Sequence, residues 1–286
     1  MPVVISDLNP RARALVSALR DIRQRYGITS RDLSRRMGFS HAFVSHWETG
    51  RRVPGPDEVA ALLGELRVTG AERDRIMRLA ESAVEPSWLG TGLVGLPEHV
   101  VKAIDCERWA DAVTEWAPAM IPELLQIPEY ARAQAMLTGA SYAEIESRVL
   151  LRGGRREVVN RSIEPVRFTA LIGETALREP IGSARIMVEQ LTQLVESAQR
   201  PNISVQIVPT LIGWHPGLAG SFTIYHFADS PEILYFPHYS SGVFFAESDH
   251  VSQHHRALDI MRDKALSESR SIKRIIELAR KWAGAA

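Results

Sequence analysis

Residues Thr29 to Pro54 read TSRDLSRRMGFSHAFVSHWETGRRVP, and this order predicts two short helices joined by a tight turn. Thr29 can accept backbone N–H bonds as an N-cap, and Asp32 stands three positions later, as in a weak capping box. Leu33 and Met37 follow at a spacing of four, which places them on one apolar face. These signals predict the first helix of the pair.

The turn and the second helix follow directly. Gly38 tolerates the positive φ that ends many helices, and Ser40 can cap a new helix that runs through Trp47. The predicted connection is about three to four residues long, as a helix-turn-helix requires. Phe43, Val44 and Trp47 recur at helical spacing and share a buried face. The side chains of the opposite face are small or polar: His41, Ala42, Ser45, His46 and Thr49.

An α-helix fits the major groove of DNA and reads base edges mainly from its N-terminal residues. The candidates for base contact are therefore His41, Ala42, Ser45 and His46. From Arg11 to Arg52 the chain holds ten arginines and three acidic residues, a local net charge of +7 in a neutral chain. Arginines along phosphates supply salt-dependent affinity without sequence information, although single arginines also cover helix surfaces without a ligand. The predicted DNA-binding residues are Ser30, Arg31, His41, Ala42, Ser45, His46, Thr49, Arg51 and Arg52.

Several of these residues form a known pattern, which consists of Gly27-Ile28-Thr29-Ser30, Leu33, Met37-Gly38, Ser40, Val44-Ser45, Trp47-Glu48, Gly50 and Arg51-Arg52-Val53-Pro54. It resembles the lambda-repressor-like helix-turn-helix family, often called the xenobiotic-response-element or XRE family. The resemblance implies a five-helix DNA-binding domain that ends near Ala83. Members commonly carry a glutamine that contacts DNA at the position of Ser30, whose side chain is shorter. The resemblance also implies a pair between Arg23 and Glu48, to which we assign a structural role.

The rest of the chain suggests two domains. Apolar periodicity predicts helices over Pro10–Tyr26, Asp57–Leu66 and Glu72–Ala83. The next residues bring one proline and three glycines into a stretch without helical period, which is typical of a linker. We therefore expect a helix-turn-helix domain over residues 1–84, a linker over 85–97, and a regulatory, ligand- or partner-binding and dimerisation domain over 98–286.

Composition narrows the class of protein. The chain has 286 residues, of which 45% are apolar and 24% charged, an ordinary globular balance. Cys106 is the only cysteine, so an internal disulfide and a cysteine-based zinc cluster are excluded, which fits a reducing compartment. Neither a membrane-spanning run nor an export signal is recognisable. We expect a cytoplasmic protein that acts at the nucleoid and does not bind membranes.

The second half of the chain contains both predicted helices and predicted strands. Helices are predicted over Glu98–Trp116, Pro128–Leu137, Tyr142–Val159, Arg185–Arg200, Asp249–Leu266 and Ser271–Trp282. Short β-rich runs bounded by turn residues are Val166–Ile172, Ile203–Val208, Ser221–Phe227, Ile233–Phe236 and Val243–Ala246. The expected fold is an all-α helix-turn-helix domain followed by an α+β domain with a mostly antiparallel sheet.

Four segments of this half also form a pattern: Ile121–Arg132, Gly173–Arg178, Val208-Pro209 with His215-Pro216-Gly217, and Ala265–Ser269. They resemble a C-terminal domain common in actinomycete regulators, regarded as antitoxin-like or of unknown function. This chain departs from that pattern at Glu123, at Ile127 and after Tyr235. The resemblance implies a regulator often encoded beside a small partner protein, and it implies no catalytic activity.

Other chemistries have weaker support. His250 and His254 are four apart, a spacing that can hold a metal, but no glutamate follows as in zinc proteases. The glycine-rich run Trp214–Gly220 lacks the lysine of a phosphate loop, so it is either a plain turn or the wall of a pocket. We expect no catalytic residue, metal or cofactor. The candidate ligand- or partner-binding residues are Trp214, His215 and the strand aromatics Phe222, Tyr225 and Tyr235.

Three hypotheses about function remain open. The first is a sequence-specific transcription factor that binds a double-stranded DNA operator as a homodimer. The second is an antitoxin-like protein whose main role is to hold a small partner protein, with DNA binding for autoregulation. The third is a switch whose DNA affinity responds to a small-molecule effector.

Overall fold

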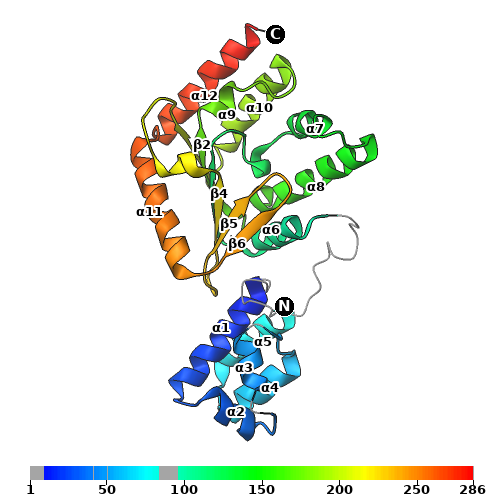
Figure 1. Cartoon of the computed structure of the whole chain (residues 1–286), viewed down its shortest axis with the longest axis vertical. Helices are drawn as coiled ribbons and strands as arrows, with labels where there is room; N and C mark the ends of the chain where they lie inside the picture. The colour runs from blue at the N-terminus through cyan, green and yellow to red at the C-terminus, as the bar shows by residue number, and fades with distance from the viewer. Residues whose placement is uncertain (1–9, 41, 50, 84–95, 286) are drawn as a thin grey trace. The chain divides into compact units, whose positions relative to one another are not determined.

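The computed structural model describes residues 10–40, 42–49, 51–83 and 96–285 (Figure 1). The chain forms two compact units: α1 to α6 belong to the first, and most of the sheet with α7 to α10 and α12 belongs to the second. Most of the expected linker, residues 85–97, lies outside the described residues. Within the described residues, no helix combines the length and the apolar character that crossing a bilayer requires.

The N-terminal helical region, residues 10–83, consists of α1 (Pro10–Arg25), α2 (Ser30–Arg36), α3 (Phe43–Glu48), α4 (Pro56–Glu65) and α5 (Gly70–Ala83). One apolar cluster joins them, because each helix buries the face on which its apolar residues recur. Leu15, Leu33, Trp47, Val59 and Ile76 are among its fully buried members. Three of these helices, α1, α4 and α5, match the sequence expectation within two residues.

The helix-turn-helix itself differs from the expectation at one helix end. The Thr29 hydroxyl accepts a hydrogen bond from the Asp32 N–H at 3.1 Å, and Gly38 has the positive φ of 75°. However, α3 begins at Phe43, so Ser40 is not its N-cap and the connection between the helices is longer than expected. Ala42 stands at the N-cap position, but its side chain cannot accept a hydrogen bond. The hydroxyl of Ser34 on α2 accepts one from the start of α3 instead.

The C-terminal region is built on a six-stranded sheet with the order β3-β2-β1-β4-β5-β6. The strands are β1 (Ala112–Ala117), β2 (Arg167–Gly173), β3 (Ile203–Val208), β4 (Phe222–His226), β5 (Ile233–Pro237) and β6 (Gly242–Phe245). The helices are α6 (Glu98–Trp109), α7 (Pro128–Met136), α8 (Tyr142–Asn160), α9 (Thr175–Arg178), α10 (Ala184–Ser197), α11 (Ser248–Lys264) and α12 (Glu268–Ala283). Two 3₁₀ turns, η2 (Glu123–Leu125) and η3 (Pro216–Ala219), complete it.

We expected a mostly antiparallel sheet, and the observed sheet is mixed, with two parallel pairings on one side. β1 pairs with β2 and β2 pairs with β3 in parallel, so that Val113 lies opposite Phe168 and Phe168 lies opposite Ile203. The reason lies in the connections: α7 and α8 stand between β1 and β2, and α9 and α10 stand between β2 and β3. Such a helical crossover returns the chain to the end of the sheet at which the previous strand began, so the next strand runs parallel to it.

The expected helix over Glu98–Trp116 is wrong in its second half. α6 ends at Trp109, and Ala112–Ala117 forms β1 in the middle of the sheet. Val113 and Trp116 are both buried there. A strand of six residues that holds both apolar and polar side chains shows too little periodicity to be told from the end of a helix, so the sequence pattern did not mark this change.

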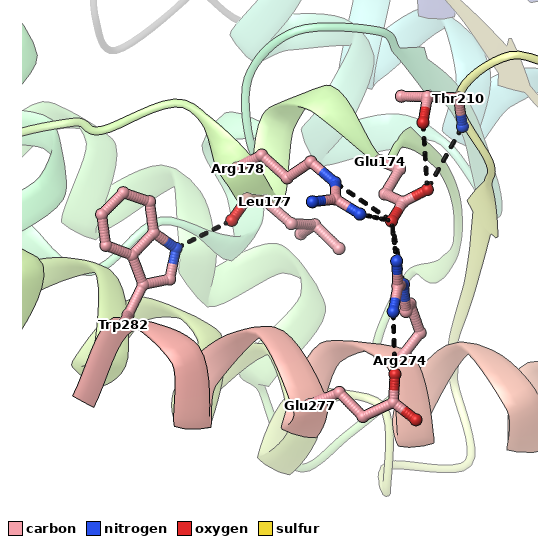
Figure 2. Close-up of polar contacts among 7 residues, drawn as sticks. All are labelled: Glu174, Leu177, Arg178, Thr210, Arg274, Glu277 and Trp282. Carbon is pink, nitrogen blue, oxygen red and sulfur yellow. Dashed lines mark hydrogen bonds and ion pairs between the residues drawn. The ribbon is translucent and has the colours of Figure 1, made fainter. Parts of the chain in front are cut away.

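A buried carboxylate joins α12 to the C-terminal ends of β2 and β3 (Figure 2). Glu174 accepts hydrogen bonds from Arg274 Nε at 2.8 Å, from Arg178 Nη2 at 2.6 Å and from the Thr210 N–H at 3.2 Å. Trp282, near the end of α12, donates a further bond to the Leu177 carbonyl at 2.9 Å. These bonds hold the last helix against the rest of the second unit.

Candidate nucleic-acid interface

The recognition helix α3 is fixed through its inner face. Val44 and Trp47 are buried in the apolar cluster of the N-terminal helical region. The Phe43 ring stacks on Phe39 with centroids 3.9 Å apart and meets the Trp47 ring edge-on at 4.7 Å. A six-residue helix is too short to be stable alone, so this packing sets its position. On the opposite face, His46 and Thr49 are exposed.

The N-terminal end of α3 is held by Ser34 on α2. The Ser34 hydroxyl accepts the Val44 N–H at 3.1 Å and donates to the Ser30 carbonyl at 2.9 Å, and the residue is fully buried. Ser34 therefore satisfies one of the unpaired N–H groups at the start of α3. Ser34 was not among the residues predicted from the sequence, and the one available signal was a small polar side chain next to the apolar Leu33.

The C-terminal end of α3 is held by α1. Glu48 receives a two-pronged ion pair from Arg23, with Nε–Oε1 at 2.6 Å and Nη2–Oε2 at 3.0 Å. The two side chains are only 13% and 14% exposed, which shields the pair from solvent. Arg23 also donates to the Ile28 carbonyl at 2.6 Å, and Arg20 donates to the Glu48 carbonyl. The two residues that the family resemblance pairs thus lie in direct contact and fix the end of the recognition helix.

The predicted DNA-binding residues occupy different environments. Arg31, His46, Thr49, Arg51 and Arg52 are exposed, whereas Ser30, Ala42 and Ser45 are partly buried. His41 lies outside the described residues. The Thr49 hydroxyl donates its hydrogen bond to the Ser45 carbonyl at 2.8 Å, so it is not available as a donor to DNA in this conformation. The exposed polar surface of this motif is therefore dominated by His46 and the arginines.

Arg52 is oriented by two neighbours. Its guanidinium forms an ion pair with Glu58 on α4 and lies over the Phe43 ring, 4.9 Å from the centroid. Glu58 also accepts the Gly55 N–H at 2.9 Å, which is the half of a capping box that a glycine N-cap can form at the start of α4. Glu58 was not among the predicted site residues, because its contact with Arg52 depends on the turn between them.

The comparisons with known proteins agree with this geometry. Residues 14–76 match a family described as a helix-turn-helix domain. Residues 100–277, well over half of the chain, match a family described as a domain of unknown function, DUF5753. The chain belongs to the DUF5753 family. No curated protein and no solved structure matches it significantly. The helix-turn-helix match covers α2 and α3 with every contact described above, and it indicates a DNA-binding regulator.

The DUF5753 region places the candidate ligand residues differently from the expectation. Phe222, Tyr225 and Tyr235 are buried, so they belong to the core of the region and not to an open aromatic face. His254 packs edge-on against the Phe222 ring at 4.9 Å, and its Nδ1 lies 2.8 Å from the His250 carbonyl. These contacts are those of a packed side chain.

Trp214 and His215 are neighbours in opposite environments. His215 is buried beside Trp116, with ring centroids 5.9 Å apart, and burial, with a smaller effect of Lys264, lowers its pKa. Trp214 is 76% exposed. Beside them, Gly217 lies so close to Trp116 and Met261 that a Cβ there would clash, and its carbonyl accepts the Trp116 Nε1–H at 2.8 Å. The glycine-rich run is therefore a tightly packed loop that exposes one large aromatic ring.

Proposed function

We propose that this protein is a transcriptional regulator that binds a two-fold symmetric double-stranded DNA operator as a homodimer. The observation that carries the proposal is the recognition helix itself, which is held at one end by Ser34 and at the other by Arg23. Fixed helix ends leave His46 and its neighbours free to meet base edges at a defined register. One short helix reads few base pairs, and two copies on a palindrome supply the specificity that one lacks.

The direct test is recovery of the chromosomal DNA that the full-length protein occupies in its own host, followed by sequencing. Sharp peaks over an inverted repeat support the proposal. Diffuse coverage that disappears as salt rises is the pattern of phosphate contact alone and would overturn sequence-specific regulation.

Two substitutions should separate phosphate contact from base contact. Arg51→Ala removes one exposed charge, so it should weaken binding to every duplex by a similar factor and lower the salt slope by about 1. His46→Ala should leave the salt slope unchanged and reduce discrimination between operator and mismatched duplex by about 1–3 kcal/mol. The measurement is fluorescence anisotropy titration from low to high salt.

Arg256→Ala is the matched control, because it removes the same charge from an exposed position on α11 in the other unit. It should leave both the slope and the discrimination unchanged. If Arg51→Ala and Arg256→Ala behave alike, Arg51 does not contact phosphate.

A second candidate function, the holding of a small partner protein, is favoured by the loop before β4. Leu211, Trp214 and Leu218 are 101%, 76% and 66% exposed on a loop whose base is held by Glu174 and Trp116. Leu211 also has a positive φ of 61°, which is unusual for a side chain of this size. A constrained loop that exposes three large apolar side chains is typical of a recognition surface.

This candidate is tested by purifying tagged full-length protein from its native host. A stoichiometric small protein should accompany the wild type and be lost from Trp214→Ser and Leu218→Ser, whereas Leu150→Ser, at an exposed leucine on α8, should retain it. Equal recovery with all variants would remove the loop from partner binding.

A further inference from the structure

Arg52 lies directly beside the recognition helix. Its backbone N–H donates to the His46 carbonyl at 3.2 Å, and its guanidinium lies over the Phe43 ring, 4.9 Å from the centroid. Both contacts are with α3 itself, so Arg52 follows this helix from near its end towards its start. The Arg52 side chain is 49% exposed. A half-exposed arginine in this place is suited to a phosphate contact, which supplies affinity without sequence information.

The charge of Arg52 is already paired within the protein. Glu58 on α4 accepts a hydrogen bond from Arg52 Nη2 through Oε1, and its Oε2 accepts the Gly55 N–H at 2.9 Å. The attraction between arginine and phosphate depends on the positive charge, and a carboxylate in contact offsets much of that charge. A phosphate that approaches Arg52 also meets the negative charge of Glu58 at close range. Phosphate and carboxylate therefore compete for one guanidinium.

The ion pair of Arg52 is much less protected than the ion pair that holds the recognition helix. Glu48 receives two hydrogen bonds from Arg23, and the two side chains are 14% and 13% exposed. The side chains of Glu58 and Arg52 are 21% and 49% exposed. Exposed ion pairs contribute little to stability, because water and ions screen them. The approach of a polyanion such as DNA should therefore break the pair with Arg52 and leave the pair with Arg23 closed.

We propose that Glu58 is an internal competitor of DNA phosphates for Arg52, so that the guanidinium exchanges the carboxylate for a phosphate when the motif binds a duplex. The exchange costs the Arg52–Glu58 ion pair on every sequence, so Glu58 lowers the sequence-independent part of the affinity. A regulator with weaker affinity for bulk DNA is retained less on the many non-specific sites of a chromosome. The inference rests on the proposed function in that the motif binds DNA, and it assigns to Glu58 the regulation of that affinity.

Glu58→Gln is the direct test. Glutamine keeps an oxygen for the Gly55 N–H, so the start of α4 and the thermal midpoint should be retained. It removes the competing charge, so Arg52 should bind phosphate without first losing a partner. We expect the dissociation constants for operator and scrambled duplex to fall by a similar factor of about five, which corresponds to a strong exposed ion pair. The measurement is fluorescence anisotropy titration of the full chain at low salt.

Asp57→Asn is the matched control. Asp57 is an exposed acidic neighbour in the first turn of α4, and its loss changes the net charge by the same amount. It should lower both dissociation constants by less than about twofold, since the interaction between separated surface charges is screened. A gain for Glu58→Gln that is clearly larger than this one cannot come from net charge alone.

Arg52→Ala provides a second control, because Glu58 then has no guanidinium to hold. In that background, Glu58→Gln should bind no more tightly than Asp57→Asn. Three results would overturn the proposal: weaker binding by Glu58→Gln than by wild type, a gain no larger than that of Asp57→Asn, or a gain that persists in the Arg52→Ala background. The first of these would show that Glu58 positions Arg52 for DNA and does not compete for it.

The scrambled duplex keeps the two proposals distinguishable. Tighter binding by Glu58→Gln without any operator preference would retain the competitor and overturn the sequence-specific regulator. Operator preference with equal affinities of Glu58→Gln and Asp57→Asn would retain the regulator and overturn the competitor. A full chain that binds no duplex would overturn both.

Discussion

Glu174→Gln is expected to lower the free energy of unfolding by about 2–3 kcal/mol, the largest stability effect that we predict in the DUF5753 region. Glutamine keeps the shape of the side chain but removes the charge that balances Arg178 and Arg274. The Glu174 side chain is only 6% exposed, so water cannot replace the lost interaction. Because Arg178 and Arg274 are themselves partly exposed, we place the effect below that of a fully buried pair. The measurement is urea unfolding of the full chain.

The same carboxylate predicts how stability changes with pH. Burial alone would raise the pKa of Glu174, but hydrogen bonds from Arg274, Arg178 and Thr210 outweigh it and hold the pKa below its ordinary value. The folded state therefore favours the ionised form. Its contribution to stability is present above the ordinary carboxyl pKa and is lost as the pH falls through the lowered value. Wild type should lose stability over this acidic range more steeply than Glu174→Gln.

Glu277→Gln is the control for both measurements. Glu277 binds the same Arg274 at 2.8 Å, but its side chain is 57% exposed. Its loss should change stability by less than about 0.5 kcal/mol, as for most exposed ion pairs. If Glu174→Gln and Glu277→Gln are equally stable, the buried network makes no net contribution to folding.

Capping residues and apolar spacing predicted the helix-turn-helix, but they did not predict where its second helix begins. That position depends on a contact between residues that lie far apart in the sequence. The start of α2 follows from Thr29 and Asp32, which interact within one turn. The start of α3 depends on Ser34, which lies ten positions before the N–H group that it caps. Ser40 lies closer in the sequence to the start of α3 and was therefore the expected cap. In the structure, Ser34 from the neighbouring helix caps α3 instead.

The direction of the strands in the sheet could not be predicted from local sequence either. The residue types of β2 and β3 identify them as strands wherever they pair. Whether two strands run parallel depends on how the intervening helices return the chain, and no single segment encodes that return. β1 is six residues long and follows the end of α6 after only two residues, so its identity as a strand depends on its two neighbours in the sheet.

Some features of the candidate site follow from local sequence, and others depend on contacts between distant residues. The outward position of His46 and the inward position of Trp47 follow from helical spacing alone. The contact of Arg23 with Glu48 was implied by family resemblance, because 25 residues separate the two and no periodicity joins them. For Phe222, Tyr225 and Tyr235, alternation along a strand did not reveal that both faces of the sheet are covered.

Glu48→Gln is expected to give the largest effect on DNA binding. Glutamine cannot replace the two-pronged charge pairing, so Arg23 is left partly buried without its counter-charge and the end of α3 loses its main tie to α1. We expect a loss of about 2–3 kcal/mol in unfolding free energy and at least about a tenfold loss of operator affinity. The direction of the second change is informative. Removing an acidic residue makes this basic region more positive, and electrostatics alone would strengthen DNA binding.

Asp21→Asn separates these two effects, because Asp21 is an exposed acidic residue of α1 and its loss changes the net charge by the same amount. It should leave stability unchanged and bind all duplexes equally or slightly more tightly at low salt. Glu48→Gln should bind the operator more weakly than either wild type or Asp21→Asn. If its operator affinity instead equals that of Asp21→Asn, the pair with Arg23 does not hold the recognition helix in its DNA-binding position, and packing around Trp47 alone would have to do so.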